Sequence, residues 1–191
     1  MFWLAVVGRA FTLANWYRGD TVQKIRTSNP DFMIRHASPD DAELVVEYMR
    51  KLGAYQKMAD KITATEPQIR RLLNEKLGEA LFGYYRGEIV GFAYFCQKSS
   101  AFTGRAGIYI DGFLVDTKVR HQGLGKIIMG YLCSLALQRN CQMMEWGVLD
   151  WNKPTIEFYR SLGAYSVDEM TIFRFTPDDL KANAHAFEGK P

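Results

Sequence analysis

The chain has 191 residues, a formal net charge of +3, 48% hydrophobic residues and 24% charged residues. These values are typical of one soluble globular domain with a sizeable core. They permit an anionic ligand, but no dense basic stripe with interleaved aromatic residues indicates a nucleic-acid partner. The cysteines lack metal-site spacing and are odd in number, so we expect no bound metal and buried thiols in a reducing, cytoplasmic compartment: Cys96, Cys133 and Cys141.

Residues 1–31 are expected to be an extension of uncertain order ahead of a domain that begins near Phe32. Residues 1–16 are apolar and aromatic but are interrupted by Arg9, and the run is too short for a membrane span. It also lacks the features of a clear signal peptide. The composition favours a poorly packed extension without firm membrane association. The alternative is an interfacial helix or a dimer contact made by Phe2, Trp3, Leu4 and Trp16.

The first half of the domain reads as a strand followed by two helices. A short strand is predicted near 32–37, and Ser38-Pro39-Asp40-Asp41 then has the N-cap serine, early proline and acidic residues of a helix start. A polar loop near 55–63 leads to Thr65-Glu66-Pro67-Gln68, which resembles a capping box and opens the second helix. The first helix has a buried stripe made of Leu44, Val45, Tyr48, Met49 and Leu52.

The second half begins with two strands, near 81–85 and 89–96, joined by a tight hairpin at Arg86-Gly87-Glu88. The strand at 108–115 is apolar on both faces, so we expect helices on both sides of the sheet. A helix follows it, and the remaining elements are expected to be a strand near 143–149, a helix from 152, a strand at 171–175 and a helix start at 176–179. This order predicts an α/β (α+β) fold with a mixed sheet.

One turn carries the strongest chemical signal: Arg120-His121-Gln122-Gly123-Leu124-Gly125-Lys126. It joins the 108–115 strand to a helix whose apolar positions recur at helical spacing. Such a turn presents backbone N–H groups and the positive end of the helix dipole, which together bind phosphate. Glycines lack the Cβ that would keep phosphate oxygens away. The alternative is that both glycines merely form a turn.

Arg120-x-x-Gly123-x-Gly125 resembles the (Q/R)-x-x-G-x-(G/A) acetyl-CoA loop of the GNAT superfamily of N-acetyltransferases. The run from Asn152 to Ala164 resembles that family's N-x-x-(A/S/T)-x-x-(F/L)-Y-x-x-x-G-(F/A) segment. A short glycine motif alone is weak, but the two motifs in this order are a strong signal. The 55–60 loop and the Trp151–Pro154 run are most similar to the diamine/polyamine N-acetyltransferase group.

The resemblance implies an acetyltransferase domain at 32–176, with a mostly antiparallel sheet, followed by a C-terminal helix and tail at 177–191. It implies acetyl-CoA as co-substrate, with the pyrophosphate on the backbone amides of residues 120–126. The pantetheine arm would pair with the preceding strand at Phe113, Leu114 and Val115. Asn152 would also contact acetyl-CoA, although a helix cap explains this residue equally well.

Two side chains are implied in catalysis. Tyr159 would donate a proton to the departing CoA thiolate, and the alternative is an ordinary core tyrosine. Asp111-Gly112 is by itself a hairpin-turn signal, whereas the resemblance implies a β-bulge with Asp111 facing the reacting centre. Among neighbours such as Tyr109 and Phe113, the pKa of this carboxylate would be raised, and it would take the proton of the substrate ammonium, directly or through water.

The acceptor is expected to be a small-molecule primary amine, either a diamine or polyamine or an amino-acid-like amine. The candidate substrate contacts are Tyr55, Asp60 and Asp111. The 55–61 loop has a single acid, and Lys57 and Lys61 oppose a polycation, so an amino-acid side-chain amine fits at least as well.

Two other classes of function stay open at this point. One is a protein N-terminal or lysine acetyltransferase, and the other is a non-catalytic acyl-CoA-binding module. Aromatic residues near the last predicted strand, Phe173 and Phe175, are compatible with a homodimer.

Overall fold

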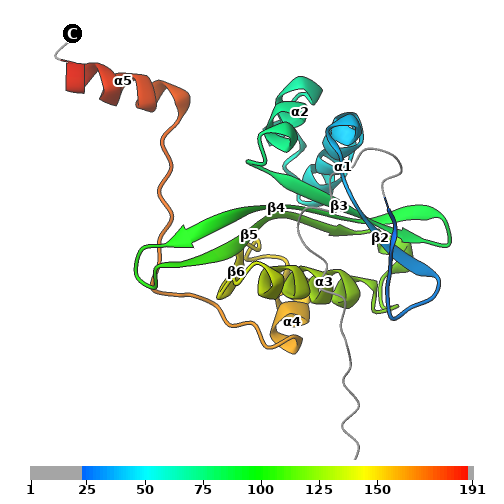
Figure 1. Cartoon of the computed structure of the whole chain (residues 1–191). Helices are drawn as coiled ribbons and strands as arrows, with labels where there is room; N and C mark the ends of the chain where they lie inside the picture. Colours follow the sequence, from blue (N-terminus) through cyan, green and yellow to red (C-terminus); the bar gives the residue numbers. More distant parts are fainter. Residues whose placement is uncertain (1–22, 189–191) are drawn as a thin grey trace, which may run out of the picture. The chain divides into compact units, whose positions relative to one another are not determined.

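A computed structural model describes residues 23–188 of the chain (Figure 1). The described residues form two compact units, which meet in the sequence between Leu149 and Asp150. The apolar N-terminal segment with Phe2, Trp3, Leu4 and Trp16 lies outside the described residues. None of the helices within residues 23–188 is long and apolar enough to cross a membrane.

The first unit is built on one six-stranded sheet in the order β1-β2-β3-β4-β5-β6. Its first five strands are antiparallel neighbours, and β6 runs parallel to β5, which confirms the mixed, mostly antiparallel sheet. The sheet begins ahead of Phe32, because β1 pairs with β2 inside the range expected to be an extension. The strands are β1 (Ile25–Arg26), β2 (Phe32–His36), β3 (Glu79–Tyr85), β4 (Glu88–Ser100), β5 (Arg105–Val115) and β6 (Met143–Trp146).

Helices cover both faces of this sheet, as the apolar 108–115 strand predicted. The helices α1 (Ala42–Tyr55) and α2 (Glu66–Asn74) lie on one face, and α3 (Leu124–Gln138) lies on the other (Figure 1). Under α1 and α2 the core is aromatic, with Tyr48, Phe82 and Phe92 in mutual ring contact. On the other face, α3 buries Leu124, Ile128 and Leu132. The sheet is therefore enclosed, and the site must lie at its edges or strand ends.

The predicted starts and turns are local features that the structure confirms. The backbone N–H of Thr65 donates to the Gln68 side chain at 2.9 Å at the start of α2, which is half of the expected capping box. In the β3–β4 hairpin, Arg86 and Gly87 have φ of 51° and 91°. Positive φ at both central residues matches the right-handed twist of the flanking strands.

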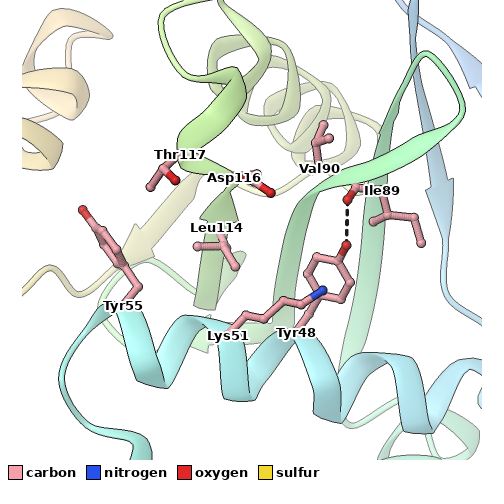
Figure 2. A pocket seen from close by; sticks show the side chains of 8 residues that line it. All are labelled: Tyr48, Lys51, Tyr55, Ile89, Val90, Leu114, Asp116 and Thr117. Atoms are coloured by element: carbon pink, nitrogen blue, oxygen red, sulfur yellow. Dashed lines mark hydrogen bonds between the residues drawn. The ribbon is translucent and has the colours of Figure 1, made fainter.

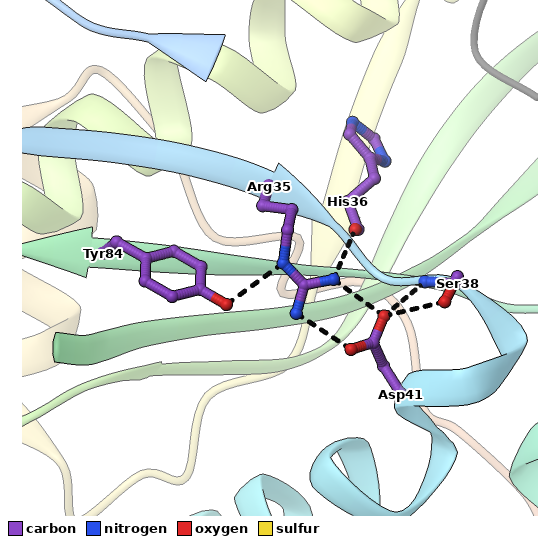
Figure 3. Close-up of polar contacts among 5 residues, drawn as sticks. All are labelled: Arg35, His36, Ser38, Asp41 and Tyr84. Atoms are coloured by element: carbon purple, nitrogen blue, oxygen red, sulfur yellow. Dashed lines mark hydrogen bonds and ion pairs between the residues drawn. The ribbon is translucent and has the colours of Figure 1, made fainter. Parts of the chain in front are cut away.

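The corner between β2 and α1 is fixed by a forked ion pair (Figure 3). The Arg35 guanidinium donates to both Asp41 carboxylate oxygens at 2.8 and 2.9 Å, and its Nε donates to the Tyr84 hydroxyl at 3.1 Å. Burial alone would raise the pKa of Asp41, but hydrogen bonds from Arg35 and Ser38 and the Arg35 charge outweigh burial and lower it. The pair orients the start of α1, the helix that ends at Tyr55.

On the opposite face, His36 joins β2 to α3. Its Nε2 lies 2.6 Å from the Tyr131 hydroxyl, and the Arg139–Glu79 ion pair lies near it. Burial lowers the pKa of His36 to about 4, with the charge of Glu79 opposing this shift and that of Arg139 adding to it. At neutral pH this imidazole is therefore uncharged, and the contact is a neutral hydrogen bond.

The second unit contains α4 (Lys153–Ser161) and α5 (Pro177–Glu188). Gly163, with φ of 90°, ends α4, where the Gly163 and Ala164 N–H groups donate to the carbonyls of Arg160 and Tyr159. The prediction of a strand at 171–175 is wrong, because these residues form no regular secondary structure. Their apolar side chains are exposed: Ile172 by 81%, Phe173 by 91% and Phe175 by 63%.

Candidate active site

A β-bulge interrupts the pairing of β4 and β5. Tyr94 pairs with Gly112 and the next residue, Phe95, pairs with Ile110, so Asp111 is an extra residue on β5. The bulge expected from the family resemblance is confirmed, and the alternative of a hairpin turn at Asp111-Gly112 is wrong, since β5 continues through both residues. The bulge matters because it changes the direction of a side chain without ending the strand.

The carboxylate of Asp111 is solvent-exposed, not enclosed by Tyr109 and Phe113 as we expected. It lies close enough to β4 to act on two side chains there. The pKa of Tyr94 and the pKa of Cys96 are both raised, first by burial and second by the negative charge of Asp111. Asp111 is thus a charged group that an incoming ammonium ion could reach from solvent.

Beyond the bulge, β5 continues past the point where its pairing with the parallel strand β6 ends. The pairing of β6 with β5 runs from Gly107–Met143 to Ile110–Trp146 and stops there. β5 continues for five more residues, 111–115, which include Phe113, Leu114 and Val115. A divergence of this kind leaves a strand edge that an extended ligand can join through backbone hydrogen bonds. The three predicted pantetheine residues lie on this segment.

The glycine turn lies between β5 and α3. A short 3-10 helix, η4 (Thr117–Val119), follows β5, and Gly123 is the N-cap of α3 with φ of 77°. The first backbone bond of α3 runs from the Ile127 N–H to the Gly123 carbonyl, so the N–H groups of residues 124–126 precede the helical ladder. This end of the helix attracts anions.

The local backbone fits an approaching phosphate. A Cβ built on Gly123 would meet no atom within 4 Å, so its surface is open to a ligand. His121 also has positive φ, 64°, which is uncommon for a residue with a side chain. His121, Gln122 and Lys126 are exposed, whereas Leu124 is buried and belongs to the core. Leu124 can therefore contact a ligand only through its backbone.

Arg120 makes a contact that sequence reasoning missed. Its guanidinium lies 4.7 Å above the ring of Tyr55, the last residue of α1. Its Nη1 and Nε lie 3.4 Å from the Tyr55 hydroxyl and the Val115 carbonyl. The sequence predicts Tyr55 as part of the acceptor loop, and in the structure its side chain contacts Arg120 of the phosphate loop. No sequence periodicity indicates this pair, since 65 residues separate the two side chains.

Tyr55 also lines a cavity of roughly 230 Å³ between α1 and the ends of β4 and β5 (Figure 2). In Figure 2, the Tyr55 side chain extends from the end of α1 to the side of the cavity on which Thr117 lies, in the segment that leads to the phosphate loop. The described carboxylates Asp60 and Asp111 are not among the lining residues. The cavity is lined by Tyr48, Lys51, Tyr55, Ile89, Val90, Leu114, Asp116 and Thr117.

The rest of the predicted acceptor loop is polar and exposed. Asp60 lies in a short 3-10 helix, η3 (Ala59–Lys61), and forms an exposed ion pair with Lys61 at 3.2 Å. The only acid of this loop is thus already beside a cation. Tyr55, at the start of this loop, contacts Arg120 of the phosphate loop.

Asn152 and Tyr159 lie in the second unit, at the start and in the second turn of α4. The Asn152 carbonyl accepts from the N–H groups of Thr155 and Ile156, but its side chain makes no capping hydrogen bond. Asn152 is nonetheless the one polar residue classed as buried among the described residues. Burial raises the pKa of Tyr159 to about 12. This phenol therefore keeps its proton throughout the physiological range.

The fold is that of acetyltransferases of known structure. An aminoglycoside acetyltransferase from an uncultured soil metagenomic sample superposes with a TM-score of 0.67 at 18% identity, covering 78% of this chain and 97% of that one. Residues 47–164 match the model of the Acetyltransferase (GNAT) family, and this match spans more than half of the chain. The chain belongs to this family and is an acetyl-CoA-dependent N-acetyltransferase.

Two relatives of described activity are similar over much of the chain. Thialysine N-epsilon-acetyltransferase of Bos taurus is 28% identical over 165 residues, covering 78% of this chain and 95% of that protein. L-ornithine N5-acetyltransferase of Arabidopsis thaliana is 28% identical over 117 residues, covering 61% of this chain and 48% of that protein.

Proposed function

We propose that this chain transfers the acetyl group of acetyl-CoA to the side-chain amine of a small amino acid or a closely similar amine. The observation that carries the proposal is the Asp111 bulge. It presents an exposed carboxylate on the strand whose next residues lie beside the divergence of β5 from β6 and lead into the phosphate loop. An amine acceptor and an extended thioester would meet at such a place.

Two properties of the acceptor loop favour an amino acid over a polyamine. A polyamine needs several carboxylates along its length, and residues 55–61 offer Asp60 alone, already paired with Lys61. An amino acid carries a carboxylate of its own, which Lys57 or Lys61 could pair with. The named relatives that act on thialysine and on ornithine support the same class, since both substrates are amino acids whose side chains end in an amine.

In the proposed reaction the amine attacks the thioester carbonyl directly, the C–N bond forms and the C–S bond breaks. Asp111 takes one proton from the substrate ammonium, directly or through water, and Tyr159 gives its proton to the departing sulfur. The second proton, which the nitrogen loses as the amide forms, returns to the Tyr159 phenolate through solvent. The pyrophosphate binds to the backbone of residues 120–126, with charge from Arg120 and Lys126. Phe113, Leu114 and Val115 pair with the pantetheine arm, and Asn152 contacts the co-substrate.

An amine panel tests this function. The purified chain is incubated with acetyl-CoA and ornithine, lysine, thialysine, putrescine, spermidine or a short lysine-containing peptide, and free thiol is recorded. We expect kcat/KM for the best amino acid to exceed that for either polyamine by about tenfold or more, because each unmatched charge costs about 1.5 kcal/mol. Cys133→Ser serves as the assay control, because Cys133 is an exposed thiol that would add background.

The same panel separates the rival functions. Fastest turnover of spermidine would make the enzyme a polyamine acetyltransferase, and turnover of the peptide alone would make it protein-directed. Tight binding of acetyl-CoA without turnover of any amine would identify a non-catalytic acyl-CoA-binding module. Each of these results contradicts the proposal in a different way.

We further propose that the enzyme works in the cytoplasm without a metal, nucleic-acid or membrane partner, as a homodimer whose acetyltransferase domain comprises residues 32–176 together with the preceding strand β1. Three free cysteines fit a reducing compartment, although of the three thiols expected to be buried only Cys141 is, whereas Cys96 is half-buried and Cys133 is exposed. The exposed apolar side chains of 172–175 support a dimer, because such residues are typically covered by a partner. Light scattering of the purified chain measures the oligomeric state directly.

A further inference from the structure

The co-substrate loop contains an arginine that is held in place by an element far away in the sequence. An arginine side chain has about 2 kcal/mol of rotamer entropy to lose when it is fixed against a phosphate. Arg120 is only partly buried, so its position depends on the groups that it contacts. Those groups belong to α1 and to the end of β5, which face the loop from two directions.

The stacking on Tyr55 is the main contact. Cζ of Arg120 lies 4.7 Å from the ring centroid, well within the roughly 6 Å over which a cation is attracted to an aromatic face. The hydrogen bonds to the Tyr55 hydroxyl and the Val115 carbonyl are both 3.4 Å, which is long for such bonds. The aromatic ring, more than the hydroxyl, should therefore hold the guanidinium.

The stacked arrangement leaves the guanidinium able to bind an anion. The two hydrogen bonds use two of the five N–H donors of an arginine, and stacking uses the face of the group and none of its donors. Tyr55 lines its cavity with Leu114, Asp116 and Thr117, which lead from β5 toward the phosphate loop. Tyr55 therefore shares this cavity with Leu114, one of the predicted pantetheine residues.

We propose that Tyr55 is a positioning residue for the co-substrate, which holds Arg120 ready for the pyrophosphate, and that it is not an amine contact. This inference rests on the proposed acetyl-CoA site at residues 120–126. The physical gain is preorganisation, since a side chain fixed before binding loses less entropy when the ligand arrives. The ring couples the end of α1 to acetyl-CoA affinity without touching acetyl-CoA.

A double-mutant cycle tests the coupling. Dissociation constants for acetyl-CoA are measured by calorimetry for the wild type, Tyr55→Leu, Arg120→Gln and the double variant, with KM for the best amine recorded in parallel. We expect Tyr55→Leu to raise the acetyl-CoA Kd by about tenfold while KM for the amine changes less than about twofold. In the Arg120→Gln background, Tyr55→Leu should have no further effect.

Two more variants sharpen the comparison. Tyr55→Phe keeps the ring, so its acetyl-CoA Kd should stay within about twofold of the wild type, and this arm decides the question if Tyr55→Leu does not fold. Tyr85→Leu is the matched control, because Arg86 stacks on Tyr85 at 5.1 Å in the β3–β4 hairpin, outside the site. Its acetyl-CoA Kd should equal that of the wild type.

The inference is overturned if Tyr55→Leu raises KM for the amine and leaves the acetyl-CoA Kd unchanged, because Tyr55 would then be an acceptor residue. It is overturned equally if the effects of Tyr55→Leu and Arg120→Gln add, or if Tyr55→Phe weakens binding as much as Tyr55→Leu. In any of these cases the proposed function still stands if the wild-type chain binds acetyl-CoA and acetylates amines. A wild-type chain that does not bind acetyl-CoA overturns both.

Discussion

The two side chains proposed for the two proton transfers have opposite surroundings. Tyr159 is buried, and burial raises its pKa to about 12, so the phenol is reliably protonated when a thiolate departs. Asp111 is exposed on its bulge and can meet a charged amine arriving from solvent. A donor that holds its proton and an acceptor open to water are suited to these roles. Each environment can be tested through the pH dependence of the rate.

We expect Tyr159→Phe to lower kcat by about 100-fold or more at every pH, because a positioned acid contributes that much, while acetyl-CoA affinity is unchanged. With its pKa near 12, Tyr159 should cause no loss of wild-type activity below about pH 11. Asp111→Asn should lower kcat/KM by about 100-fold or more, because a positioned base contributes that much. The measurement is kcat/KM against pH for the three proteins.

Either assignment can fail separately in that experiment. Wild-type turnover in Tyr159→Phe would make Tyr159 a core tyrosine, which is the alternative that its burial allows. Unchanged kcat/KM at every pH in Asp111→Asn would remove Asp111 from the mechanism.

At the scale of elements, the start of α3 depends on the backbone of one glycine. Gly123 has φ of 77°, a conformation that costs a residue with a Cβ about 1–2 kcal/mol. We expect Gly123→Ala to lower the free energy of unfolding by about that amount and also to weaken acetyl-CoA binding, because the added methyl group stands where a phosphate would approach. Thermal unfolding and calorimetry measure the two effects.

Gly104 provides the matched control. It has φ of 63° in the β4–β5 hairpin, and a Cβ there would also meet no atom within 4 Å. Gly104→Ala should lose similar stability and keep the wild-type affinity for acetyl-CoA. If both variants bind acetyl-CoA equally well, the glycine turn only shapes the chain and does not contact phosphate.

Elements with local causes could be predicted from the sequence, and elements that depend on a partner could not. The helix starts at Ser38 and Thr65 and the hairpin at Arg86-Gly87 follow from their own residues. The 171–175 segment consists mainly of β-branched and aromatic residues, which favour a strand. Strand formation also depends on a neighbouring strand, and none of the described strands pairs with this segment. The local sequence therefore suggested a strand at 171–175, but it could not show whether a neighbouring strand was there to pair with it.

The site shows the same division. The phosphate loop and the Asn152–Tyr159 helix were indicated by linear motifs and lie on the elements expected. The two interpretations of Asp111-Gly112 could be separated only by the pairing of β4 with β5, which decides between a turn and a bulge. The contact of Tyr55 with Arg120 required the crossing of α1 over the sheet, which no motif records.

At the scale of the whole molecule, acid stability should depend on His36. The unfolded chain binds a proton at this imidazole near pH 6.5, whereas the folded chain resists it until about pH 4. The unfolded state therefore holds more protons between these values, and the free energy of unfolding falls as pH drops through this window, by up to about 1.4 kcal/mol per pH unit. Above pH 6.5 this contribution is constant.

Denaturant unfolding between pH 4 and 7 checks this expectation. His36→Gln has no titrating group and should flatten the pH dependence, whereas His185→Gln, at an exposed histidine of α5, should not. Equal slopes for the wild type and His36→Gln would show that the burial of His36 is not the source of acid sensitivity.

The bulge at Asp111 has a consequence for how such an enzyme could change over evolution. The partners of Ile110 and Gly112 are adjacent residues on β4. The register of the β4–β5 pairing on both sides of Asp111 therefore does not depend on Asp111. The proposed base is thus an insertion in a sheet that needs no residue there. Selection could exchange it for a longer acid, or delete it, without reorienting a single core side chain, so catalysis at this position is free to diverge while the fold is preserved.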